Sequence, residues 1–556
     1  MTERIFKKVA EIFKKTPSSS WIIFFIVLIG IFLRTYNFHD WLRFSMDQSR
    51  DAMIISNALE GKSELPLLGP LAGGTDFHLG PAYYYFSFLS ATLFGNYPDK
   101  MAYPSLIFSI LSMPLLYLFM KEYFSGKISL ILTAIMSVSY FAVINSRFSS
   151  NPNLTPFFVL LFLYSFSKLI SGQNKNSIWW SVLVGLSLGI GIQLHATLLI
   201  IMPVCAVIFF AYFLKRSSLP ALKHILVALL IFMTVNVTQI ISEMRTNRKN
   251  TRQFFSGLTE KSGGKNSMIN NISNILSCQF KANASIISST QEIENCSKGI
   301  DFNIKTGSKE LYDDIKNRIL RRTTYSLNIS FVLIFSLVGY FLAIYYFRKD
   351  KDAKKRIFLG MFLVFNSVSL LVMLPIANYL YVGYFIILLF VPFVFLGLWL
   401  KFLEEKFQIK GKRIGLCLVT VLVILSVWSD VKAAYLNDQG LDNSSENTDF
   451  REIKNVSDFI LKNSLSEKII YLSGENKYLD RYSRPVEYMI SRQNKKLVII
   501  DASQLGDGNI PSKFVFFIKN RGTSDIINNR PVDGYETISS CRFYAVDISV
   551  LKNNAK

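Results

Sequence analysis

The sequence predicts an α-helical polytopic membrane protein with an α/β domain at its C-terminal end. Three observations lead to this fold class. The 556 residues are 51% hydrophobic, and their mean hydropathy is +0.31. The apolar residues gather in nearly uncharged blocks of 15 to 23 residues, each about long enough to cross a hydrocarbon core of ~30 Å. The basic residues flank these blocks and form no separate domain.

Eleven of these blocks are candidate transmembrane helices. They are Trp21–Tyr36, Met101–Met120, Ile128–Ile144, Leu154–Ile170, Ile178–Leu194, Thr197–Leu214, Ala221–Ile241, Tyr325–Phe347, Ile357–Ile376, Leu380–Leu400 and Arg413–Trp428. A twelfth apolar run, Pro81–Phe94, would form a helix of only ~21 Å, which is too short to span. Pro81 suits a first helical turn and Gly95 suits a C-cap. We therefore expect this helix to lie at the membrane interface.

The net charge of +22 fits the positive-inside rule better than binding to nucleic acid. The N-terminus is rich in lysine and arginine, which places it in the cytoplasm. Eleven spans place the basic segments 348–356 and 401–413 on the same side. The outer side then receives a first loop, Asn37–Lys100, a second loop, Ser146–Asn153, and a long loop, Ser242–Thr324. These predictions describe a multi-pass protein of the inner or plasma membrane.

The chain divides into a transmembrane domain, 1–430, and an extracytoplasmic domain, 431–556. In the second domain we expect strands at Ile469–Leu472, Leu497–Ile500, Phe514–Ile518 and Phe543–Ile548, and helices at Phe450–Leu461 and Val486–Arg492. Within the long loop, the polar and basic stretch Thr246–Gly264 is expected to be mobile. Cys278 and Cys296 share this loop. A disulfide between them and two free thiols are both open alternatives.

The first outer loop carries the residues best placed for chemistry. Asp47 directly follows the first span, in the segment Phe44–Asp51. A carboxylate beside the membrane surface loses hydration, which raises its pKa and makes it a better general base. The alternative is that Asp47 only caps the helix that follows. Asp51 is expected to be a solvated residue of that helix.

The order of motifs resembles the C-type (GT-C) membrane glycosyltransferases, and among them the protein O-mannosyltransferases and the lipid A aminoarabinose transferases. The pattern begins with Asp47-x-x-Arg50 and a short helix, followed by His78 and the aromatic helix that starts at Pro81. It continues through the second loop and the hairpin Gln193–His195. The resemblance covers about the first 245 residues in motifs and the rest of the chain in layout.

This resemblance implies transfer of a sugar from a polyprenyl-phosphate donor to a hydroxyl acceptor on the outer face, with inversion at the anomeric carbon. Asp47 matches the acid of the family and would deprotonate the acceptor. The leaving phosphate needs positive charge and hydrogen-bond donors. The candidates for donor or substrate binding are Arg50, His78, Arg147, Asn151, Asn153, His195 and Arg245. A purely structural role is the alternative for each histidine and for Arg147.

Many members of these families have an aspartate in the second outer loop, where this chain has Asn151 or Asn153. Asparagine cannot supply charge to a divalent cation, so we predict no metal site and no cofactor. Asp51, Asp76 and Glu243 leave a divalent metal open. Tyr379 and Tyr381 are candidates to line the site or to pack in the core.

Two other functions compete with the transferase. One is a flippase or transporter of lipid-linked sugars, although no internal repeat is evident and the charges gather at one face. The other is a binding protein whose α/β domain carries the function. Protein, lipid and polysaccharide acceptors all stay open.

Overall fold

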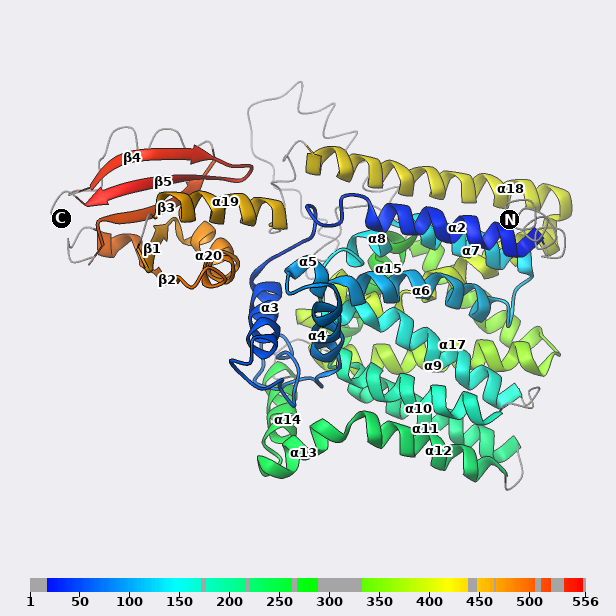
Figure 1. The fold of residues 1–556 in the computed structure, drawn as a ribbon. Coiled ribbons are helices and arrows are strands. Elements are labelled where there is room, and N and C mark those ends of the chain that lie inside the picture. The colour runs from blue at the N-terminus through cyan, green and yellow to red at the C-terminus, as the bar shows by residue number, and fades with distance from the viewer. Residues whose placement is uncertain are drawn as a thin grey trace, which may run out of the picture.

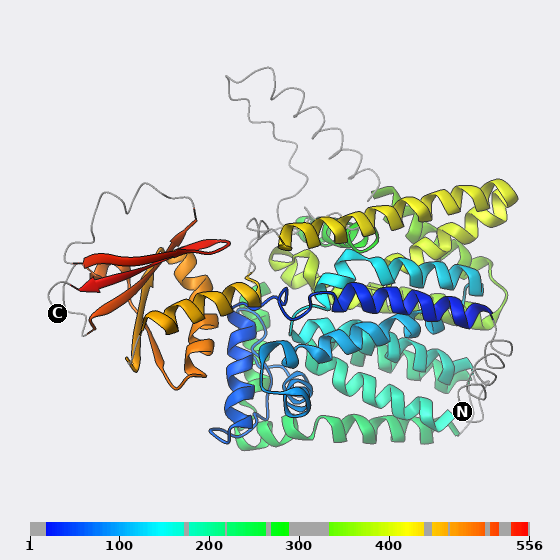
Figure 2. The same ribbon diagram turned by 45° about the horizontal axis from the view of Figure 1, so that its top comes forward.

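The computed structural model describes residues 18–171, 177–216, 220–262, 268–288, 333–438, 448–464, 467–505, 512–521 and 535–553. They form a bundle of long helices and a smaller domain built on a β-sheet (Figure 1). A helix of the first outer loop stands between the two parts, across the ends of the bundle helices (Figures 1 and 2).

The first half of the chain supplies one side of the bundle. Its helices are α2 (Ser18–Thr35), α6 (Tyr103–Met120), α7 (Gly126–Val138), α8 (Tyr140–Asn145), α9 (Thr155–Ser171), α10 (Ser177–Leu194), α11 (Leu198–Arg216), α12 (Pro220–Val235) and α13 (Val237–Arg245), with the 3-10 turn η1 (Asn151–Leu154) before α9. Two predicted spans are broken. Ser139 separates α7 from α8, and α12 and α13 meet at an angle of 59°.

The second half of the chain completes the bundle. It contributes α15 (Met268–Ser288), a helix over 333–349, α17 (Ala353–Met373), the 3-10 turns η2 (Leu374–Tyr379) and η3 (Val382–Leu388), and α18 (Val391–Asp438). A kink divides α18 at Gln408, whose φ of 48° is not helical. A continuous apolar core joins residues of α6, α7, α9, α11, α15, α17, η3 and α18.

Five helices of the described residues are long and apolar enough to cross a membrane, or six if α12 and α13 form one span. Three shorter apolar helices are Ser20–Thr35, Gly126–Val138 and Ile178–Leu194. The expected number of eleven stays a prediction, because breaks in the helices shorten several of the predicted spans below the length of a straight crossing. The helices nevertheless define a multi-pass membrane protein.

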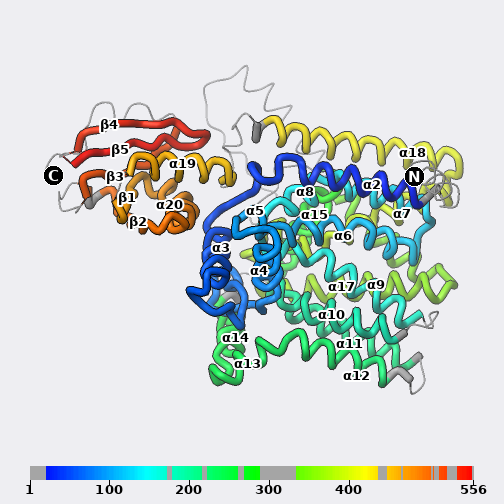
Figure 3. Tube along the Cα trace, viewed as in Figure 1, coloured from blue at the N-terminus to red at the C-terminus, as the bar shows by residue number. Residues whose placement is uncertain are grey.

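The first outer loop contains three helices: α3 (Met46–Leu59), α4 (Ala82–Phe94) and α5 (Pro98–Met101). The helix expected over Pro81–Phe94 is therefore present. It ends where expected, because Gly95 adopts a φ of 115° and donates its N–H to the carbonyl of Ala91 (2.9 Å). The Cα trace shows α3 and α4 at the end of the bundle that faces the sheet domain (Figure 3). Their position at the membrane surface stays a prediction.

The stretch Thr246–Gly264, expected to be a mobile loop, is helical over most of its length, and its mobility stays a prediction. Residues Lys249–Ser262 form the helix α14. Asn250 anchors this helix, because its side chain accepts from the N–H of His78 (2.8 Å) and donates to the carbonyl of the same residue (2.9 Å). The segment 242–324, expected to be an outer loop, also contains the bundle helix α15, in which Cys278 is buried and disulfide-bonded. Cys296 lies outside the described residues.

The C-terminal domain is a five-stranded mixed sheet with the strand order β2-β1-β3-β5-β4. Its elements are α19 (Phe450–Asn463), β1 (Ile469–Gly474), α20 (Asn476–Ser491), β2 (Lys496–Ile499), the 3-10 turn η4 (Ala502–Leu505), β3 (Phe514–Asn520), β4 (Tyr535–Arg542) and β5 (Val546–Asn553). Leu472 of β1 pairs with Ile499 of β2 and Phe516 of β3, both in parallel, whereas β5 runs antiparallel to β3 and β4.

The predicted α/β class and three of its four strands are confirmed. The fourth run, Phe543–Ile548, covers the turn between β4 and β5 and only the start of β5. Strand β4 escaped prediction because it is a sheet edge with mostly exposed or half-exposed side chains, so it carries no apolar run. The helix expected at Val486–Arg492 is the last part of the longer α20.

Candidate active site

Helix α3 presents Asp47 in its first turn. The N-cap is Ser45, whose backbone N–H donates to Oε1 of Gln48 (3.2 Å). The alternative that Asp47 caps this helix is therefore wrong, since Ser45 fills that position. A carboxylate in the first turn is still favoured by the positive end of the helix dipole.

The two aspartates of α3 lie in opposite environments. The residues buried on this helix are Gln48, Ser49, Asp51, Ala52, Ile55 and Ser56, at spacings of three and four. Asp51 is only 3% exposed, so the expectation of a solvated residue is wrong. The side chain of Asp47 is 73% exposed, so the expected loss of hydration falls on Asp51 instead.

Arg50 joins the two carboxylates. Its Nη1 lies 2.9 Å from Oδ1 of Asp47, and its Nη2 lies 2.8 Å from Oδ1 of Asp51. Its Nε donates to the same oxygen of Asp51 (2.9 Å), which also accepts from the Tyr84 hydroxyl of α4 (3.0 Å). Because charge-assisted hydrogen bonds are strong and directional, the buried carboxylate fixes Arg50, and Arg50 in turn holds the exposed carboxylate.

Burial controls the electrostatics of this group. It raises the pKa of Asp51 to about 6, even though the charge of Arg50 and the hydrogen bonds from Arg50 and Tyr84 lower it. For Tyr84, burial and then the charge of Asp51 raise the pKa, so its hydroxyl stays protonated and donates. Burial lowers the pKa of Arg50, but the charges of Asp51 and Asp47 more than offset this effect, and Arg50 stays a cation.

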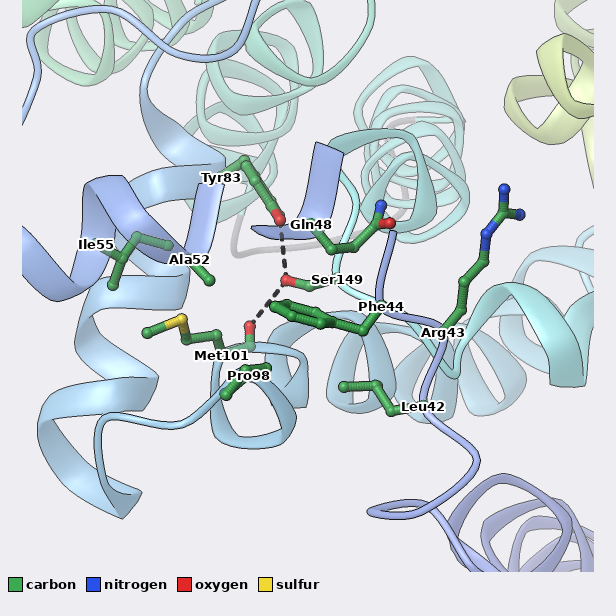
Figure 4. Close-up of a pocket in the computed structure, with 10 residues that line it drawn as sticks. All are labelled: Leu42, Arg43, Phe44, Gln48, Ala52, Ile55, Tyr83, Pro98, Met101 and Ser149. Carbon is green, nitrogen blue, oxygen red and sulfur yellow. Dashed lines mark hydrogen bonds between the residues drawn. The ribbon is translucent and has the colours of Figure 1, made fainter. Parts of the chain in front are cut away.

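A small pocket with about 240 Å³ of empty space lies against the buried side of α3 (Figure 4). It is lined by Leu42, Arg43, Phe44, Gln48, Ala52, Ile55, Tyr83, Pro98, Met101 and Ser149. The Ser149 hydroxyl lies 2.9 Å from the Tyr83 hydroxyl and donates to the carbonyl of Met101 (3.1 Å). These bonds tie the second outer loop to α4 and α5. The pocket therefore lies between α3 and the elements that support it. Asp47 does not line it and faces away from the buried side of the helix.

Arg43 and Tyr381 contribute further groups beside the N-terminal end of α3. The Arg43 guanidinium stacks over the ring of Phe148, 5.2 Å from its centre. Tyr381, between η2 and η3, is 52% exposed, and its phenol is close enough to Arg43 and Asp47 to interact with their charges. The predicted cavity candidate Tyr381 is therefore brought towards Asp47.

Arg147 and His78 make contacts of their own. Arg147 is 7% exposed and donates to the carbonyls of Leu33 (3.1 Å) and Tyr36 (2.6 Å), at the C-terminal end of α2. His78 places Nδ1 2.8 Å from the carbonyl oxygen of Gly69. These contacts match the structural alternative for both residues.

The asparagines and His195 lie where the second loop meets the hairpin after α10. Asn151 donates to the carbonyl of Leu194 (2.7 Å), and Asn153 donates to that of Phe148 (3.0 Å). His195 is 8% exposed and places Nδ1 2.8 Å from the Thr197 hydroxyl. Burial lowers the pKa of His195 to about 4, so its ring is neutral near pH 7. Arg245 is exposed at the end of α13.

Asp51 and Tyr84 are the members of this group that the sequence prediction did not assign. A signal for Asp51 was present, because it follows Gln48 by three residues and precedes Ile55 by four, which places all three on one helical face. The signal for Tyr84 was weaker, since it is one of three consecutive tyrosines. Within the described ranges, no three His, Cys, Asp or Glu side chains gather into a possible metal site. Metal-independent activity stays a prediction.

Comparison with protein families gives one match. The model of the family described as dolichyl-phosphate-mannose-protein mannosyltransferase matches residues 78–238. This range starts at His78 and includes α4, the second outer loop and the His195 hairpin. No curated protein matches the sequence.

Solved structures match nearly the whole chain. ArnT from Cupriavidus metallidurans in the apo state has a TM-score of 0.54 at 9% identity, over 96% of this chain and 98% of ArnT. The Archaeoglobus fulgidus oligosaccharyltransferase in its apo form has a TM-score of 0.51 at 13% identity, over 92% of this chain and 70% of the archaeal enzyme. ArnT has also been solved with undecaprenyl phosphate (TM-score 0.52), and the archaeal enzyme AglB with an inhibitory peptide and a dolichol-phosphate (TM-score 0.51).

The chain therefore has the fold of the C-type membrane glycosyltransferases. Together with the family match, this fold indicates a glycosyltransferase. The resemblance to the O-mannosyltransferases and to ArnT, predicted from the order of motifs, is confirmed.

Proposed function

We propose that this protein is an inverting glycosyltransferase that moves a sugar from a polyprenyl-phosphate donor to a hydroxyl acceptor on the outer face of the membrane. Asp47 is its general base. The observation that carries the proposal is the presentation of this carboxylate, within an ArnT-like fold, at the exposed side of a helix lying across the end of the bundle. Its contact with Arg50, at 2.9 Å, fixes where the carboxylate points.

The proposed reaction is a single displacement. Asp47 takes the proton of the acceptor hydroxyl while the acceptor oxygen forms a bond to the anomeric carbon. The bond from that carbon to the phosphate oxygen breaks, and the lipid phosphate leaves with the electron pair. Attack from the face opposite the leaving group inverts the anomeric centre. A base in this position typically contributes ~10²–10⁴-fold in rate.

The lipid phosphate as donor is supported by the ligands named for ArnT and AglB. One arginine between two carboxylates leaves the group of Asp47, Arg50 and Asp51 with a net charge of −1 when all three are ionised. The leaving phosphate therefore needs further cations. The exposed Arg245 is our first candidate and Arg147 is the second. His78, His195, Asn151 and Asn153 already bond within the protein, so each would have to exchange a partner in order to bind a substrate.

The test is transfer by the purified protein in lipid nanodiscs. Radiolabelled polyprenyl-phosphate sugars are supplied with envelope fractions as acceptors, and labelled product is separated from lipid. We expect label to move to an acceptor with inverted anomeric configuration, identified by digestion with α- or β-specific glycosidases. Movement of the labelled lipid across a vesicle membrane without any transfer would contradict the proposal and favour the flippase.

A further inference from the structure

The C-terminal domain holds the N-terminal end of α3 through backbone pairing. The N–H of Phe44 donates to the carbonyl of Thr448 (2.9 Å), and the N–H of Phe450 donates to that of Leu42 (2.8 Å). Arg43 and Asp449 form an antiparallel bridge between these two hydrogen bonds. The segment that enters the sheet domain therefore adds a short strand to the residues directly before Asp47.

An aromatic cluster strengthens the same end. Phe44 is 1% exposed and lies between Phe450 and Tyr488, with ring centres 5.5 and 5.6 Å away. Such edge-to-face pairs are worth ~0.5–1.5 kcal/mol beyond the area that they bury. Tyr488 belongs to α20 and Phe450 begins α19, so the C-terminal domain supplies both rings that pack against Phe44, the residue before the N-cap.

The rest of α3 is held by α20. The Tyr488 hydroxyl lies 3.1 Å from the Ser56 hydroxyl, and Nη1 of Arg492 lies 2.6 Å from Oε1 of Glu60. On the other side, Tyr84 of α4 donates to Asp51. Helix α3 thus contacts α20 near its C-terminal end and α4 through Asp51, and both views show it between the sheet domain and the bundle (Figures 1 and 2).

We infer that the C-terminal domain is a brace for α3, in which Tyr488 and Arg492 are positioning residues that set where Asp47 and Arg50 stand. This assignment of a role in transfer rests on the proposed function. A brace differs from an acceptor-binding module, because the side chains of Tyr488 and Arg492 contact α3 and its C-cap and not a substrate. A brace acts on the rate of the chemical step, since the base is displaced, whereas an acceptor site acts on acceptor affinity.

The pair Glu60 and Arg492 allows a charge-swap test. Their side chains are 35% and 25% exposed, so the variants Glu60→Arg and Arg492→Glu are expected to fold. The matched control is Arg484→Glu, which changes the same charge at an exposed position of α20, the helix that Arg492 caps. The first readout is amide hydrogen exchange of residues 46–59 in the full-length protein in nanodiscs, which needs no substrate. We expect each single variant to speed exchange about three- to five-fold, the double variant to restore it, and the control to leave it unchanged.

The second readout is transfer kinetics. We expect each single variant to lower kcat several-fold with unchanged KM for acceptor and donor, and the double variant to recover most of the loss. A raised acceptor KM with unchanged kcat and no recovery in the double variant would overturn the inference and favour an acceptor site. Unchanged exchange in both single variants would also overturn it. If the native protein transfers no sugar, the proposed function fails, while the exchange measurements still decide whether the domain braces α3.

Discussion

Replacement of Asp51 by asparagine is predicted to raise the free energy of unfolding of the protein and to lower its rate of sugar transfer. Asn keeps the size of the side chain and an oxygen that can accept from Tyr84, but it removes the buried negative charge. Burial raises the pKa of Asp51 from 3.8 to about 6. At ~1.4 kcal/mol per pKa unit, the ionised carboxyl costs the folded protein on the order of 3 kcal/mol near neutral pH.

The sign of the pH dependence follows from the raised pKa. Below about pH 4 the carboxyl of Asp51 is protonated in both the folded and the unfolded chain, and the native protein and Asp51→Asn should be equally stable. Between pH 4 and 6 the unfolded chain releases this proton while the folded chain keeps it, so the free energy of unfolding of the native protein falls. Above about pH 6 the variant should be more stable by up to about 3 kcal/mol.

The assay measures the free energy of unfolding of both proteins in detergent by denaturant titration, at several pH values between 4 and 8. A variant that is less stable than the native protein at pH 8, or a difference that does not change with pH, would refute this reasoning. Transfer should fall in the variant, on the order of 10- to 100-fold, because Arg50 loses the carboxylate that fixes it. A more stable and slower enzyme is the usual result when a strained site is relieved.

The remaining predictions concern pH, metal and topology. Transfer by the native protein should fall as the pH drops through about 6, because Asp51 becomes protonated and releases Arg50. Transfer by Asp51→Asn should not show this fall. Activity should survive EDTA; complete loss that Mn²⁺ or Mg²⁺ restores would show that a metal is required. For topology, we expect cysteines introduced at Ser63 and Lys454, in a Cys541→Ser background, to be labelled from outside. A cysteine at Lys351 should be labelled only after permeabilisation, and the reverse pattern would contradict the eleven-span arrangement.

Much of the architecture was predictable because it depends on local patterns. Apolar blocks predicted most helices of the bundle, although α15 falls in the segment expected to be an outer loop, and Pro81 and Gly95 marked the short helix α4. The breaks inside predicted spans were not predictable. Ser139 ends α7, and its hydroxyl donates to the carbonyl of Ile286 in α15, a contact that composition alone does not report. The break at Gln408 falls within 401–413, the segment expected to join two spans.

The candidate site was predicted in place but not in detail. The position of Asp47 just after the first span identified α3. The environment of each aspartate depended on which side of that helix faces α4 and the sheet domain, and those neighbours lie about 30 and 400 residues away in sequence. A count of helical periodicity from Gln48 would have placed Asp51 with Ala52 and Ile55 on the buried side. Pairing of residues 40–44 with 448–451 had no local signal.

The central claim is that Asp47 removes the acceptor proton, and Asp47→Asn tests it most directly. Asn keeps the size of the side chain, and Ser45 rather than Asp47 caps the helix, so folding should be unaffected. At saturating donor and acceptor, with unchanged binding of the lipid-linked donor, we predict that turnover falls ~10²–10⁴-fold. Turnover close to that of the native protein would contradict the account and place the base elsewhere.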